Sequence, residues 1–129
     1  MLSAELHYPD AANLLDDKAS IYVSLQNLQG EVILTLYGFY RVWGILKLLA
    51  LEPVGDAIPE GIEISRSLCK KMKAALQCIH NAGFFHGNIA HHNFCRMAWD
   101  KVFLVYLERC QYSGNPSELI NEMNQVDAL

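Results

Sequence analysis

The sequence predicts an α+β fold in which helices and short strands alternate along the chain. Three observations lead to this prediction. Apolar residues recur at helical spacing near the start, in the middle and at the end of the chain. Two continuous apolar runs between the first two helical stretches are typical of buried strands. A polar loop after the middle helix, followed by two shorter apolar runs, predicts a β-hairpin.

Composition favours one folded domain without a nucleic-acid or membrane partner. Hydrophobic residues make up 52% of the 129, which is too apolar for a disordered chain. The net charge of −4 comes without a basic face, so no nucleic acid is expected. Arg41 and Lys47 interrupt the longest apolar stretch, so no membrane span is expected either. Four unpaired cysteines and no recognisable secretory leader predict an intracellular, by default cytoplasmic, protein.

A first helix is expected over residues 11–28. Pro9 and Asp10 suit its start, because proline fits the first helical turn and aspartate the positive end of the helix dipole. Gly30 suits its end, and the residues before Pro9 show little pattern. The apolar residues of this stretch fall near a 3.6-residue period: Leu14, Leu15, Ala19, Tyr22, Leu25 and Leu28.

Two strands are expected next, over 31–40 and 45–52, with a turn at 41–44 that pairs them antiparallel. Apolar residues run continuously through both strands, so we expect both to be buried. Proline and glycine at 53–56 and again at 59–61 should end the sheet and form a hinge.

The clearest predicted element is a second helix over 65–82, which Gly83 should stop because glycine readily takes a positive φ. Its apolar stripe is formed by Leu68, Met72, Ala75, Leu76 and Ile79. Phe84 and Phe85 should then anchor the polar loop in the core.

Two short strands over 94–97 and 101–107 should follow the loop as a hairpin. Ser117 is expected to cap a last helix over 118–129. Its inward side is predicted to carry Leu119, Ile120, Met123 and Val126.

The loop itself carries the motif His86-Gly87-Asn88, with Asn93 five residues after Asn88. This stretch resembles the catalytic loop of protein-kinase-like folds, and more closely that of short fungal kinase-like proteins whose loop reads His-Gly-Asp. Residues 28–38 and 49–55 also resemble that family, as a helix end, a strand, and a strand entering the hinge. The resemblance covers roughly residues 13–129.

This resemblance implies one partial, N-terminally truncated kinase-like domain over 1–129. Residues 11–52 would be a remnant of the small lobe, 53–60 the hinge, and 61–129 the helical lobe. It also implies a nucleotide-binding set. Leu51 would sit near the gatekeeper position, and the Glu52 carbonyl and Val54 N–H would face adenine. Cys95 would lie on the adenine floor, where the family usually has leucine.

The same resemblance implies a degraded catalytic apparatus. His86 would be a structural loop residue and Asn93 the metal-binding asparagine. Asn88 stands at the position of the catalytic aspartate, and its neutral amide cannot take up a proton, a role that contributes about 10²–10⁴-fold in rate. Tyr106 stands at the position of the metal-binding aspartate, and a phenol is a poor Mg²⁺ ligand. Glu108 would share a strand face with Tyr106 and is the candidate substitute carboxylate.

The start of the chain departs from the family as well. Lys18 stands where the family has the glutamate of its small-lobe helix. Neither a Gly-rich loop nor a strand bearing the phosphate-binding lysine is expected before that helix. We therefore expect a pseudokinase-type interaction module or a truncated product rather than an enzyme. No cofactor is firmly expected, and ATP with Mg²⁺ would bind only if the pocket survives.

Two alternatives stay open at this point. One is an active ATP-dependent phosphotransferase, acting on a protein or a small molecule, with a non-standard metal site. The other is a non-kinase helical interaction protein whose resemblance is accidental. His86, His91, His92 and Cys95 also suggest zinc ligands, with His91 and Cys95 spaced i, i+4. A complete set of four ligands at fitting spacings is not visible, so loop histidines are favoured.

The two predicted strands would lack neighbours on their outer sides. Such an open apolar edge favours strand addition by a protein partner or self-association of the chain. We therefore expect either another protein or a second copy of this chain as the partner.

Overall fold

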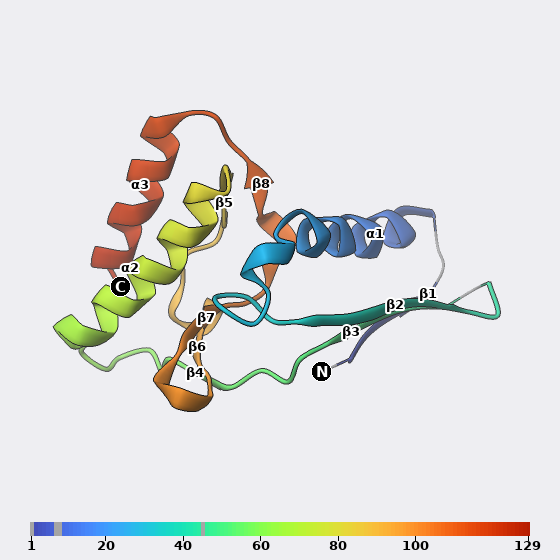
Figure 1. Ribbon diagram of the computed structural model, residues 1–129, viewed down its shortest axis with the longest axis horizontal. Helices are drawn as coiled ribbons and strands as arrows, with labels where there is room; N and C mark the ends of the chain where they lie inside the picture. The colour runs from blue at the N-terminus through green and yellow to red at the C-terminus, as the bar shows by residue number, and fades with distance from the viewer. Residues whose placement is uncertain (1, 7–8, 45) are drawn as a thin grey trace.

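The computed structural model describes residues 2–6, 9–44 and 46–129 and confirms an α+β fold (Figure 1). The helices are α1 (Pro9–Ser24), α2 (Arg66–Asn81) and α3 (Pro116–Asp127). The longer strands are β1 (Leu2–Leu6), β2 (Leu36–Val42) and β3 (Leu46–Leu51). The short strands are β4 (Asp56–Ala57), β5 (Phe84–Phe85), β6 (Phe94–Arg96), β7 (Val102–Leu104) and β8 (Gln111–Tyr112).

An antiparallel sheet in the order β1-β3-β2 lies along one side of α1 (Figure 1). The expected pairing of β2 with β3 is confirmed. A third strand, β1, precedes the first helix, where the sequence shows little pattern; it pairs with β3 and makes β3 the central strand. This strand reads Leu-Ser-Ala-Glu-Leu, so it contains no lysine.

The strand predicted over 31–40 has different bounds in the structure, because it starts and ends later in the sequence. Residues 28–33 form a turn in which the Gly30 N–H donates to the Ile33 carbonyl at 2.8 Å. The Val32 carbonyl accepts from the Leu104 N–H at 2.8 Å, so this part of the backbone bonds to β7 rather than to β3. The strand therefore begins only at Leu36 and continues to Val42.

Burial of both strands was expected, and for β2 this is wrong. Lys47, Leu49 and Leu51 of β3 are buried. Along β2, by contrast, Tyr37 and Tyr40 are 63% and 53% exposed. The difference follows from position, since β3 lies inside the sheet and β2 lies at its edge.

Helix α2 forms where the pattern predicted it. The Ser65 side chain caps its start by accepting from the Leu68 N–H at 3.1 Å. The chain leaves the helix through Gly83, whose φ of 88° is the left-handed conformation that glycine accommodates. Buried residues on the side of α2 that faces the hairpin are Met72, Ala75, Leu76 and Ile79.

The hairpin predicted after the loop is present, with β6 and β7 antiparallel and β4 added beside β6. Its second strand is shorter than expected. It stops at Leu104 because Tyr106 takes a left-handed conformation (φ 58°, ψ 67°) and Leu107–Arg109 forms a 3₁₀ turn.

The last helix, α3, starts earlier than expected, at Pro116. Its N-cap is Asn115 rather than Ser117, and the Asn115 side chain accepts from the Ser117 N–H. Ile120, expected inward, is exposed.

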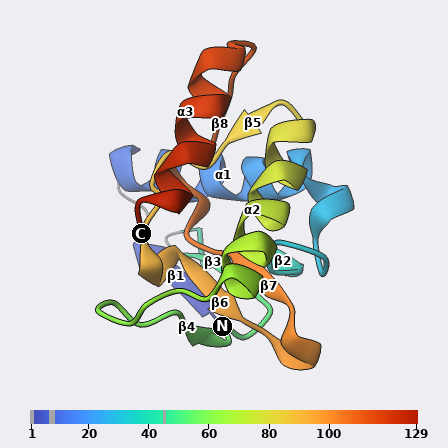
Figure 2. The same cartoon turned by 90° about the vertical axis from the view of Figure 1, so that its left-hand side faces the viewer.

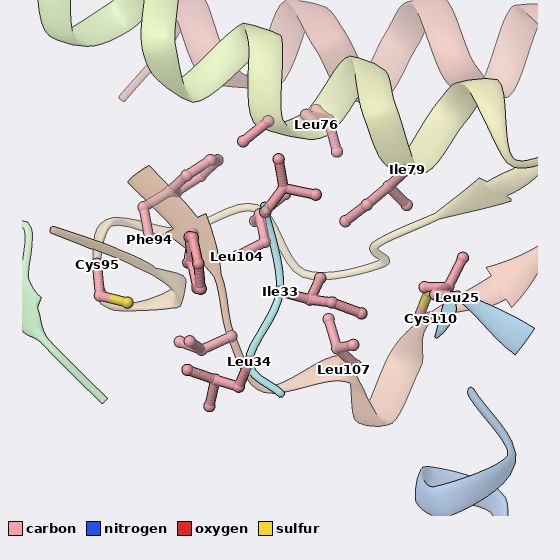
Figure 3. Packing of buried hydrophobic residues seen from close by; sticks show 14 of the residues in the cluster. Leu25, Ile33, Leu34, Leu76, Ile79, Phe94, Cys95, Leu104, Leu107 and Cys110 are labelled. Atoms are coloured by element: carbon pink, nitrogen blue, oxygen red, sulfur yellow. The ribbon is translucent and has the colours of Figure 1, made fainter. Parts of the chain in front are cut away.

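Figure 2 shows α2 and α3 beside each other, with the β4-β6-β7 sheet under α2. The buried side chains form one core cluster shared by the helices, the hairpin and residues 32–34. In Figure 3, Ile33 and Leu34 lie among Leu104 and Leu107, while Leu76 and Ile79 of α2 face the same cluster. The polar loop is thus held between elements that share a single core. In the described part of the chain, no helix is long and apolar enough to cross a membrane.

Candidate functional site

The loop at residues 86–93 lies between β5 and the β6-β7 hairpin, and Glu122 of α3 fixes its start. The Glu122 carboxylate accepts from the N–H groups of His86 and Gly87, both at 2.8 Å. The carboxylate also contacts His80 Nε2 of α2 at 2.8 Å, and Glu122 is only 5% exposed. One buried carboxylate therefore joins α3, the end of α2 and the loop.

His86 is completely buried, and its imidazole holds the loop to the segment after β7. Its Nε2 faces the Val105 carbonyl at 2.8 Å, so Nε2 carries the proton and donates. The Asn88 N–H donates to Nδ1 at 3.3 Å. Burial lowers the pKa of His86, and the backbone carbonyl of Val105 opposes this only in part. The ring is therefore neutral at pH 7 and serves as a two-sided hydrogen-bonding spacer.

Asn88 and Asn93 are in direct contact. The Asn93 side-chain NH₂ donates to the Asn88 carbonyl at 2.6 Å. The Asn93 backbone carbonyl accepts from the Val105 N–H at 2.9 Å. Asn88 itself is exposed, and its amide cannot act as a general base. The buried Asn93 Oδ1 has no hydrogen-bond partner within the described structure.

Tyr106 and Glu108 do not share a strand face, which corrects the sequence expectation. Strand alternation ends at Leu104, and Glu108 lies in the following 3₁₀ turn. Its Oε1 pairs with Lys18 Nζ of α1 at 3.1 Å. The Lys18 side chain is 12% exposed and the Glu108 side chain 51%. The carboxylate nearest in sequence to Tyr106 is therefore neutralised by a lysine.

This donor set does not fit Mg²⁺. The ion prefers hard, anionic oxygens in an octahedral arrangement. The loop offers one neutral amide oxygen from Asn93, a phenol from Tyr106, and a carboxylate already paired with Lys18. A zinc site is no better supported, because both ring nitrogens of His86 are hydrogen-bonded to backbone groups. No cluster of three or more His, Cys, Asp or Glu ligands occurs in ranges 2–6, 9–44 and 46–129.

The residues expected around adenine lie at the end of β3 and on β6. Leu51 and Cys95 are buried. Glu52 forms two hydrogen bonds with Thr35. Its Oε1 accepts from the Thr35 N–H at 2.9 Å, and its backbone N–H donates to the Thr35 carbonyl at 2.9 Å. Glu52 thus fastens residues 32–35 to the end of β3. Val54 is half-buried against the core.

Segment 53–57 packs directly on the hairpin. A Cβ on Gly55 would collide with the carbonyl oxygen of Arg96, so only glycine allows this approach. Ala57 pairs with Cys95 between β4 and β6. Burial raises the pKa of the Cys95 thiol, which makes it a packing residue rather than a nucleophile.

Three charged contacts escaped the sequence analysis: Glu122 with the loop, Lys18 with Glu108, and Lys47 with Asp16. Only the contact of Glu122 could have been inferred from the sequence. Glu122 lies next to Met123 on the buried side of α3, where a carboxylate needs partners. The other two pairs join residues whose proximity depends on the tertiary fold.

No protein-family model matches the sequence, and no curated protein matches it. Solved structures do match the fold. It is similar to vaccinia related kinase 3, with a TM-score of 0.62 and 17% identity over 86% of this chain and 41% of that one. It is also similar to a divergent Toxoplasma kinase lacking the glycine-rich loop, with a TM-score of 0.77 and 17% identity over 97% of this chain and 50% of that one. That protein regulates the membrane ultrastructure of the parasitophorous vacuole.

The described chain therefore has a kinase-like fold, and it spans half or less of the length of these two solved structures. Residues 86–93 form a loop between helix α2 with β5 and the β6-β7 hairpin. The fold therefore does not support the alternative of a helical protein whose kinase resemblance is accidental.

Proposed function

We propose that this chain is a pseudokinase-type domain, which keeps a kinase-like fold without transferring phosphate and acts by binding another protein. The observation that supports the proposal most directly is the Lys18–Glu108 pair at 3.1 Å. It places a lysine ammonium against the carboxylate next to Tyr106, where phosphoryl transfer would need a carboxylate bound to a metal ion.

The exposed Asn88 amide supports the same proposal. Phosphoryl transfer depends almost entirely on positioning and charge stabilisation. A neutral amide in place of the base and a phenol in place of the metal ligand weaken both contributions. Their losses do not add, since the groups act as a unit. The loop is nevertheless firmly held by Glu122 and His86, which suits a binding surface that needs shape but no chemistry.

One observation supports a second function, an active phosphotransferase with a non-standard metal site. The buried Asn93 Oδ1 lacks a hydrogen-bond partner in the described structure, and an unsatisfied buried acceptor costs about 1–3 kcal/mol. A metal ion would satisfy it. This function requires Glu108 to leave Lys18 and reach the loop.

A thermal-shift titration with ATP, with and without Mg²⁺, separates the two functions. A ligand that binds only the folded state stabilises it by about 2.7 kcal/mol at a hundredfold excess over its Kd. The proposal predicts no Mg²⁺-dependent shift for the wild type. It also predicts none for Lys18→Met, which frees Glu108, or for the control Lys73→Met, which alters a partly exposed lysine paired with Asp127.

An activity measurement completes the test. Incubation with labelled ATP should give neither ADP nor phosphoprotein above the level of a heat-denatured sample. A Mg²⁺-dependent shift that grows in Lys18→Met would support the second function. Phosphate transfer by the wild type that is lost in Asn88→Ala would overturn the proposed one.

A further inference from the structure

Strand β2 presents an aromatic edge that the fold leaves open. Its only strand partner within the described structure is β3, although the Leu36 N–H at its start donates to the Gln29 Oε1 at 3.0 Å. Tyr37, Phe39 and Tyr40 are 63%, 40% and 53% exposed, and Trp43 in the turn that follows is 86% exposed. An edge with free backbone groups and apolar side chains is a template for another strand. Proteins commonly protect such edges with charges, and Arg41 is the single charge in β2.

We infer that β2 pairs antiparallel with β2 of a second copy of this chain, about a two-fold axis at Phe39. This goes beyond the proposed function and does not depend on it. The argument rests on the sequence of the strand, Leu-Tyr-Gly-Phe-Tyr-Arg-Val, which is self-complementary in this register. A two-fold interface requires such a match, because each residue meets its counterpart's surface.

Each cross-strand pair in this register is favourable. Phe39 meets Phe39, an aromatic pair at the axis, and Leu36 meets Val42. Gly38 meets Tyr40, and glycine, which has no side chain, leaves room opposite the Tyr40 ring. The Tyr40 ring already lies over Gly38 of its own strand, since a Cβ there would collide with it. Tyr37 meets Arg41, so the one cation of the strand faces an aromatic ring.

The surroundings of the edge fit the same occupant. The pairing of β2 with β3 is irregular between Leu36 and Gly38, which leaves Tyr37 outside that ladder. A groove of about 470 Å³ between α1 and β2 adjoins Phe39 and is lined by Ala19, Val23 and Leu36 among others. Val23 at its rim is 60% exposed. The groove lies beside the axis, where the second copy's Phe39 ring would enter.

The other free edge, on β1, is a weaker candidate. In the same kind of two-fold pairing about Ala4, each Ser3 would meet a Glu5, and no aromatic pair would form. Glu5 would face only a serine, whereas Arg41 of β2 faces an aromatic ring. The aromatic strand therefore defines the interface.

Light scattering coupled to size exclusion tests the inference on the full chain. The wild type should give twice the mass of the 14.6 kDa chain and dissociate on dilution. Phe39→Glu should give a monomer, because two carboxylates would then meet at the axis, and Phe39→Lys should do the same. The matched control Trp99→Glu changes an aromatic that is 93% exposed on the β6-β7 turn and should remain dimeric.

Mixing the two Phe39 variants distinguishes a lost contact from a lost fold. Equal amounts of Phe39→Glu and Phe39→Lys should recover the dimer, because opposite charges then face each other across the axis. A misfolded variant cannot be rescued in this way. A monomeric wild type, a dimer that survives both charge variants, or a mixture that stays monomeric would each overturn the inference.

Discussion

Glu122 is the residue on which the geometry of the loop depends most. Its carboxylate receives three contacts at 2.8 Å, from His80 Nε2 and from the N–H groups of His86 and Gly87. Glu122→Ala would leave these groups buried without a partner. A buried donor left without its acceptor costs roughly 1–3 kcal/mol. We expect a loss of this size in the free energy of unfolding measured with urea.

The control for that measurement is Gln125→Ala on the same helix, at an exposed position. It should change stability by less than about 0.5 kcal/mol, as exposed surface substitutions usually do. Equal losses in the two variants would show that α3 responds to any change and that Glu122 has no special role.

His86 gives the fold a dependence on pH. Burial lowers its pKa below the ordinary value of 6.5, so the folded state favours the neutral ring. Below pH 6.5 the unfolded chain takes up a proton that the folded chain still refuses. Stability should therefore fall as the pH drops from 6.5 towards the lowered pKa, by at most about 1.4 kcal/mol per pH unit.

The variant His86→Gln isolates this contribution, because glutamine has a donor and an acceptor but does not titrate. Unfolding free energies measured between pH 7 and 5 should decline less steeply in this variant than in the wild type. An unchanged slope would assign the dependence on pH to other groups.

At the scale of elements, a partly buried ion pair joins α1 to the sheet. Lys47 Nζ of β3 contacts Asp16 Oδ2 at 2.8 Å, and the lysine side chain is 4% exposed whereas the aspartate side chain is 45% exposed. Asp16→Ala leaves an ammonium buried without its partner and should cost roughly 1–3 kcal/mol. Lys47→Met removes the charge and keeps the packing, so it should be neutral or stabilising by up to about 4 kcal/mol.

Urea unfolding of these two variants and of the double variant measures the coupling. The double variant should be about as stable as Lys47→Met, because Asp16 then has no buried charge to compensate. If Lys47→Met were as damaging as Asp16→Ala, the pair itself would be worth more than the apolar contacts that replace it.

The elements that could be predicted from sequence are those whose signals are local. Helix α2 was predicted because its apolar period lies within the helix itself and its stop signal, Gly83, follows directly after it. The start of β2 was not, because the Val32 carbonyl bonds to Leu104, which is distant in sequence. Apolar character alone does not distinguish a strand from a core segment such as 32–34.

The same distinction holds for the candidate site. Asn88 and Asn93 were recognised as members of one loop motif, and the structure places them in direct contact. The pair of Lys18 with Glu108 joins α1 to the turn after β7, and neither residue signals the other in the sequence. A carboxylate in a loop therefore cannot be assigned to a metal until its counter-ions are known.

At the scale of the whole molecule, residues 32–34 connect the sheet to the helical part of the chain. Ile33 and Leu34 are completely buried in the one cluster that also contains Tyr22 of α1, Leu76 of α2 and Leu104 of β7. If this cluster is the shared core, Ile33→Ala should lower the free energy of unfolding by roughly 2–5 kcal/mol. Exposed Ile62→Ala, at 60% exposure, is the control and should have little effect.

Hydrogen exchange shows whether that loss is shared. With one core, amides in β3 and in α2 should exchange through the same opening, and both should lose protection equally in Ile33→Ala. Their protection should also track the loss measured in urea by circular dichroism. If β3 lost protection while α2 kept it, the sheet with α1 would open as a separate unit. Residues 32–34 would then belong to the core of the sheet alone. The kinase-like fold would consist of two independently stable parts.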